Sequence, residues 1–132
     1  MKTKKDNRVA HERGHPLRSL GRALTLLWGL IWALFGLLSG LGEGMDVVGT
    51  VVHVTVPGLI FLATALLAWR YEKLGAAVLL AEGCIVAISY PLVFRAMSAS
   101  TVIFVLLTMA LPPLIAGLLF LLDWRKFHEA AA

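Results

Sequence analysis

Four long apolar runs, separated by short polar segments, make up most of this chain. They cover about residues 20–41, 47–69, 74–94 and 101–122. About 20 apolar residues in a helix, rising 1.5 Å each, cross the roughly 30 Å of hydrocarbon in a bilayer. Each run reaches that length, so the pattern predicts four transmembrane helices.

The polar segments between the runs are short, at about residues 42–46, 70–73 and 95–100. Short connections make consecutive helices antiparallel neighbours. We therefore expect an all-α membrane domain over residues 19–126, an antiparallel up-down bundle of four helices.

The two ends of the chain differ from this domain. Residues 1–18 form a basic segment with few apolar side chains, which we expect to be disordered or to lie on lipid headgroups. Residues 127–132 form a second short tail.

Composition supports lipid as the solvent of the apolar runs. The chain is 59% hydrophobic and only 15% charged, whereas a soluble domain carries about 25% charged residues. A soluble core needs polar faces to cover it, and residues 23–122 offer too few. In lipid, helices satisfy their own backbone groups and need no such cover.

The basic residues are distributed unevenly between the two sides of the predicted bundle. Eleven of the twelve Lys and Arg residues fall on the side of the termini, and Arg95 alone falls on the other. Positive residues stay cytoplasmic. This predicts an inner (cell) membrane protein with both termini in the cytoplasm. It also argues against nucleic acid as a partner, because no folded basic face carries the charge.

One small-residue face is a candidate for helix packing. Gly29, Ala33, Gly36 and Gly40 recur every three or four residues, so they share a face of the first helix. In lipid, helices associate through such close approaches. The face is expected to pack against another helix of the same chain or, alternatively, against a second copy.

Two ionisable residues inside the runs, with Tyr90, form the candidate polar site. An ionisable group within a span is a functional hypothesis by default. Glu82 is either protonated, or hydrogen bonded to another span as structural glue, or it couples protons or recognises substrate charge. His53 either forms a hydrogen bond with a neighbouring carbonyl or with Tyr90, or it ligates a metal or haem.

Prolines inside three of the runs add backbone acceptors at one depth. A proline within a helix removes the hydrogen bond to the carbonyl four residues earlier. Pro57, Pro91 and Pro112 therefore free carbonyls at residues 53, 87 and Thr108. Counted by helix rise, these lie about 10 Å from the outer surface.

Two interpretations of these kinks stay open. One is an outward-facing polar vestibule containing His53 and Tyr90, with a charged rim of Glu43, Asp46 and Arg95 above it. The other is a set of independent kinks whose carbonyls are satisfied by Ser and Thr hydroxyls. A structure in which the carbonyls have separate partners and no shared cavity would contradict the vestibule.

Several short motifs resemble a family of small prokaryotic four-span membrane proteins, a domain-of-unknown-function group. They are Gly42-Glu-Gly44, His53-Val-Thr-Val-Pro57, Trp69-Arg-Tyr-Glu-Lys-Leu-Gly75, Leu111-Pro-Pro113 and Gly117-Leu-Leu-Phe120. The resemblance covers about residues 20–126. It implies a fold and a membrane location and carries no activity.

The sequence contains no nucleotide-binding glycine loop, no CxxC motif and no catalytic triad. His11 and His15 have the helical spacing of metal ligands, but Gly14 and Pro16 argue against a stable helix there. We expect a non-enzymatic structural or accessory membrane component without catalytic residues, metal or cofactor. Its expected partners are the lipid bilayer and either its own copies or a larger membrane complex. One alternative is a small proton- or cation-coupled transporter or channel using Glu82 and His53. A weaker one is a metal- or haem-binding redox subunit using His53.

Overall fold

The computed structural model describes residues 16–129, and every regular element in that range is a helix. This confirms the all-α class. The elements, in chain order, are α2 (Pro16–Gly42), α3 (Val47–Val54), η1 (Thr55–Leu59), α4 (Ile60–Arg70), α5 (Glu72–Val93), α6 (Ala99–Val105), η2 (Leu106–Ala110) and α7 (Leu111–Glu129). The elements η1 and η2 are single π-helical turns.

Local chemistry explains where these helices begin. Pro16 opens α2, where its fixed φ suits a first helical turn and its missing N–H costs nothing. The side chains of Asp46 and Ser98 accept hydrogen bonds from Gly49 N and Thr101 N, which caps α3 and α6. The last residues of the predicted basic tail are therefore helical, and residues 1–15 of it lie outside the described residues.

The second predicted helix, over residues 47–69, is not continuous. At Val56 the backbone leaves helical geometry (φ −116°, ψ 106°), and η1 absorbs the break. The residue before a proline is pushed out of the α region, which places the break directly before Pro57. Three helical stretches, at Pro16–Gly42, Glu72–Val93 and Ala99–Phe127, are long and apolar enough to cross a membrane, not the four expected.

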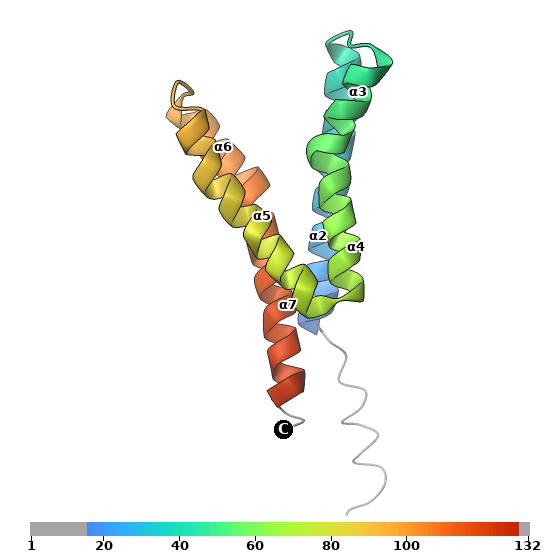
Figure 1. Ribbon diagram of the computed structural model, residues 1–132, viewed down its shortest axis with the longest axis vertical. Helices are drawn as coiled ribbons and strands as arrows, with labels where there is room; N and C mark the ends of the chain where they lie inside the picture. The colour runs from blue at the N-terminus through green and yellow to red at the C-terminus, as the bar shows by residue number, and fades with distance from the viewer. Residues whose placement is uncertain (1–15, 130–132) are drawn as a thin grey trace, which may run out of the picture.

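The chain forms two helical hairpins that meet at one end and separate at the other (Figure 1). One contains α2, α3 and α4, and the other contains α5, α6 and α7. We call the joined end, with the α4–α5 turn, the closed end, and the end with the other two turns the open end. The expected compact bundle is thus present near the closed end only.

The buried core explains why the hairpins stay together at the closed end. Small residues and two large ones from α4, α5 and α7 pack there: Ala68, Ala76, Leu79, Ala116 and Phe120. Gly75 lies directly against Ala68, at a distance that leaves no room for a Cβ. Gly83 and Gly117 let α5 and α7 approach in the same way.

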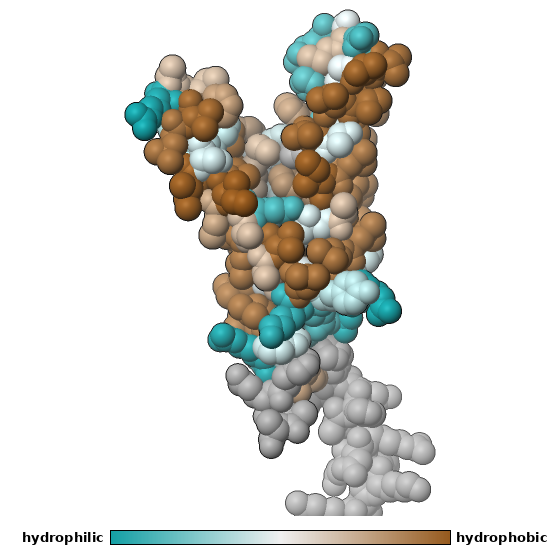
Figure 2. All heavy atoms as spheres, viewed as in Figure 1, coloured by the Kyte–Doolittle hydropathy of each residue, from teal (hydrophilic) through white to brown (hydrophobic). Residues whose placement is uncertain are grey.

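The surface of both arms is apolar over most of its length (Figure 2). Many Leu, Ile, Val and Phe residues along these helices are 40–80% exposed, among them Leu27, Leu38, Val47, Ile88 and Phe104. Hydrophilic residues form a band at the closed end. Large exposed apolar surfaces of this kind suit a hydrocarbon environment and not water.

Candidate functional site

The small-residue face of α2 lies against α3, η1 and α4. Gly36 faces the carbonyl of His53, and Gly40 faces Thr50. Gly29 faces Leu62, and the backbone of Ala33 lies against Gly58 of η1. Within the chain, this face therefore brings α2 into backbone contact with the interrupted helix, including the carbonyl that Pro57 leaves without its α-helical donor.

The carbonyl of Thr108 lies where its own helix cannot supply a hydrogen-bond donor. Its α-helical donor would be the N–H of residue 112 and its π-helical donor that of residue 113, and both positions are proline. In η2 the N–H of Leu111 donates to the carbonyl of Leu106 and not to that of Thr108. The backbone of this helix thus offers the Thr108 oxygen no donor at either register.

Two tryptophans of α2 supply that donor. The indole N–H of Trp28 donates to the Thr108 carbonyl at 2.6 Å, and that of Trp32 donates to it at 3.2 Å. The Trp28 ring also stacks on Phe61 of α4, with centroids 3.9 Å apart, and is only 5% exposed. Trp28 therefore connects the two hairpins.

This arrangement differs from a shared vestibule at two of the three carbonyls. The carbonyls of residues 53 and 108 have separate neighbours on α2, a glycine for one and two indoles for the other. A pocket of about 380 Å³ does lie beside Thr108, lined by Trp28, Trp32, Phe104 and other apolar side chains. Neither His53 nor Tyr90 lines it.

The structure also separates the predicted site residues from one another. His53 belongs to the α2–α4 hairpin and Tyr90 to the other, where its ring packs on Phe94. Within residues 16–129 no hydrogen bond joins His53 to Tyr90. Of the predicted rim, Glu43 and Asp46 lie at the tip of one arm and Arg95 at the tip of the other (Figure 1).

Glu82 makes the second polar contact between the hairpins. The Thr64 hydroxyl of α4 donates to Glu82 Oε1 at 2.6 Å and lies 3.1 Å from the carbonyl of Ile60. Thr64 is 7% exposed. The other carboxyl oxygen, Oε2, is buried and has no hydrogen-bond partner within the described part of the chain. One oxygen of the carboxyl group is thus fixed by a hydrogen bond, and the other is buried without one among the described residues.

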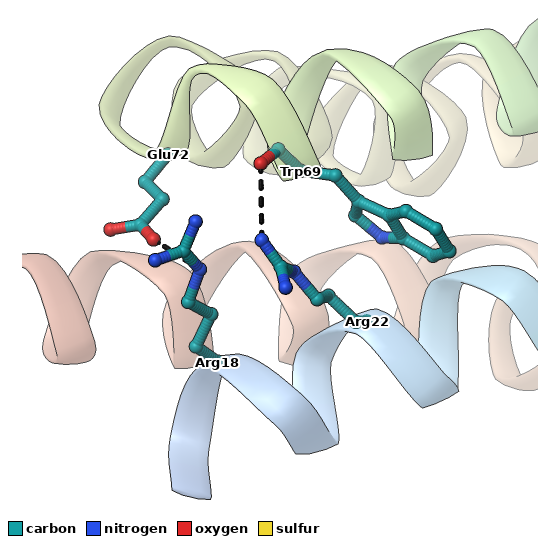
Figure 3. A network of polar contacts seen from close by, with 4 residues as sticks. All are labelled: Arg18, Arg22, Trp69 and Glu72. Carbon is teal, nitrogen blue, oxygen red and sulfur yellow. Dashed lines mark hydrogen bonds and ion pairs between the residues drawn. The ribbon is translucent and has the colours of Figure 1, made fainter. Parts of the chain in front are cut away.

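The closed end carries a polar network between α2 and the α4–α5 turn (Figure 3). Arg18 forms an ion pair with Glu72, at 2.5 Å. Arg22 donates to the carbonyl of Trp69 at 3.2 Å, and the Trp69 indole donates to Thr25 Oγ1 at 3.3 Å. The last carbonyls of a helix lack donors within the helix, and Arg22 supplies one for the carbonyl of Trp69 at the end of α4.

Sequence reasoning missed several of these residues. Trp28 and Trp32 are one helical turn apart in the sequence, which indicates only a stripe of aromatic side chains. The adjacent prolines at 112 and 113 are the one signal that could have revealed an acceptor in need of outside donors. Thr64 is one threonine within an apolar run, and nothing in the sequence indicates that it bonds Glu82. Asp123, which follows the fourth apolar run, is only 1% exposed.

A family model described as "Domain of unknown function (DUF7670)" matches residues 11–132. No curated protein matches the chain. No solved structure matches it either.

Proposed function

Because the chain belongs to this family, DUF7670, whose description names no activity, we propose a function from the geometry: a non-enzymatic structural or accessory component of the inner (cell) membrane. It crosses the membrane four times, with both termini in the cytoplasm, as a family of small prokaryotic four-span proteins would. Its partners are lipid and either its own copies or a larger membrane complex.

The observation that carries this proposal is the use of the polar groups inside the apolar helices. Glu82 bonds Thr64 and the Thr108 carbonyl bonds Trp28, and each contact joins one hairpin to the other. In lipid, such contacts and small-residue packing hold helices together. The contacts of these groups therefore support a role in assembly.

Four crossings are supported by the course of the interrupted helix. The segment over residues 47–70 runs beside α2 from the open end to the closed end (Figure 1). Non-helical backbone is tolerated at membrane depth where protein covers it. Here Ala33 and Gly36 of α2 cover the break.

The cytoplasmic placement of the closed end is supported by charge. Between residues 16 and 129, the closed end carries Arg18, Arg22, Arg70, Lys73, Arg125 and Lys126, and the open end carries Arg95. Basic residues next to spans stay cytoplasmic. The aromatic rings of Trp69 and Trp124 at the closed end suit the same interface.

A small proton- or cation-coupled carrier is the second candidate, favoured by Glu82 Oε2. A buried carboxyl oxygen without a partner is a place for a proton or a cation. His53, the other residue of this alternative, lies on α3, and its backbone carbonyl faces Gly36 of α2.

Glu82→Gln separates the two candidates in purified, liposome-reconstituted protein. Gln keeps an acceptor for Thr64 but cannot exchange a proton. A structural component should retain its assembled mass by native mass spectrometry and show no proton flux above empty liposomes, before or after the change. Flux that is pH-dependent and abolished by Glu82→Gln, but kept in the exposed control Glu43→Gln, would establish the carrier instead.

A further inference from the structure

The closed end contains an open pocket at the α4–α5 turn, beside the Arg18–Glu72 ion pair. Its volume is about 710 Å³, and it is lined by Arg18, Arg70, Tyr71, Glu72, Lys73, Leu74, Ala77 and Trp124. Three of these side chains are cations and one is an anion. The pocket therefore has an excess of positive charge.

That excess is concentrated on two residues. The Arg18–Glu72 ion pair neutralises one cation. Arg70 lies over the ring of Tyr71, with its guanidinium carbon 5.3 Å from the centroid, and Lys73 lies over Trp124, with its ammonium 5.0 Å from the centroid. Cation–π contacts orient these groups and leave their charge in place.

The backbone of the pocket favours an anion as well. Residues 72–74 form the first turn of α5, whose N-cap residue, Tyr71, gives no side-chain hydrogen bond. First-turn N–H groups have no partner within the helix, and the helix dipole is positive at this end. An oxyanion in the pocket would meet both the cations and this helix end.

The rest of the lining is apolar. Leu74, Ala77 and the Trp124 ring continue from the charged residues toward the apolar arms. A free inorganic anion would make no use of that surface. A phospholipid has a phosphate joined to acyl chains and would contact both parts.

We propose that this pocket binds the phosphate of an anionic phospholipid headgroup in the cytoplasmic leaflet, with Arg70 and Lys73 as its main contacts. Basic pockets between helices on the cytoplasmic side are a known form of lipid recognition. The inference rests on the membrane placement proposed above. It adds a specific lipid site to it.

The test is lipid retention in native mass spectrometry. Full-length protein in mild detergent is titrated with phosphatidylglycerol or with phosphatidylcholine, which has the same chains and no net charge. Wild type should retain phosphatidylglycerol preferentially. Each basic residue near anionic lipid contributes roughly fivefold to affinity, so the double change Arg70→Gln, Lys73→Gln should weaken retention roughly 25-fold.

The matched control is Arg125→Gln with Lys126→Gln, which removes the same charge at the same end but outside the pocket. It should leave retention near wild type, and the charge-preserving Arg70→Lys, Lys73→Arg should retain most binding. Equal loss in the control would overturn the site in favour of general surface charge. Displacement of phosphatidylglycerol by millimolar inorganic phosphate would overturn the lipid assignment.

These outcomes are distinct from failure of the proposed function. A protein that does not partition into membranes fails the proposed placement. A protein that inserts normally but retains both lipids equally fails only the inference.

Discussion

The indole N–H of Trp28 donates a 2.6 Å hydrogen bond to the carbonyl oxygen of Thr108, across two hairpins and eighty residues of sequence. Two adjacent prolines, at 112 and 113, make that oxygen dependent on a donor from outside its own helix. The same indole stacks on Phe61. Trp28 thus makes a polar and an apolar contact at the junction of the arms.

Trp28→Phe should destabilise the protein by about 1–2 kcal/mol, because it removes the donor and keeps most of the ring that stacks on Phe61. Trp32→Phe should cost less, because its bond is longer and the side chain is only half-buried. The double change should cost more than the sum, since the carbonyl then lacks any donor. Unfolding in detergent, followed by circular dichroism, measures all three.

Pro112→Ala provides an internal check on this reading. It restores an N–H four residues after Thr108, which can bond the freed carbonyl. Trp28→Phe should therefore cost less in the Pro112→Ala background than in wild type. An unchanged cost would mean that Trp28 stabilises the protein through its packing alone.

Gly36→Ala should separate α2 from α3 and destabilise the protein by about 1–3 kcal/mol. A Cβ at Gly36 would run into the backbone carbonyl of His53, which cannot move aside as a side chain could. Gly42→Ala is the matched control in the same helix, because a Cβ there has no atom within 4 Å. Comparable losses of thermal stability in the two variants would rule out this close approach.

Thr64→Val should destabilise the junction by about 1–3 kcal/mol, because Glu82 then loses its one hydrogen-bond partner among the described residues. Thr64→Ser keeps the hydroxyl and should cost much less. Glu82→Gln keeps the acceptor and should also be mild. If Thr64→Val and Thr64→Ser melt at the same temperature, the hydrogen bond contributes nothing.

Much of the helical layout could be predicted from hydropathy alone, because 20 apolar residues between polar turns leave little choice in lipid. The kink before Pro57 could be predicted from the steric effect of proline on the preceding residue. The π-helical form of the turn at the kink could not be predicted in this way. Pro112 predicts that the Thr108 carbonyl lacks its helical donor, but the donor that replaces it, Trp28, lies eighty residues away. Only the packing of α2 against η2 reveals that pairing.

The splayed arms could not be predicted from the sequence, because the apolar pattern is the same for a closed bundle and for an open pair of hairpins. The packing of Ala68, Ala76 and Phe120 holds the two hairpins together at the closed end. The separation of His53 from Tyr90, on different hairpins, has the same origin. Equal depth along two helices places residues at one level and says nothing about the distance between the helices.

The central claim, four crossings with the closed end in the cytoplasm, is tested most directly by cysteine accessibility. In a Cys84→Ser background, single cysteines replace Glu43, Lys73, Arg95 and Lys126 in turn, and intact spheroplasts are treated with an impermeant maleimide. We predict labelling at 43 and 95 in intact spheroplasts, and at 73 and 126 only after lysis. Labelling at 43, 73 and 126 with protection of 95 would mean three crossings, and would contradict the account.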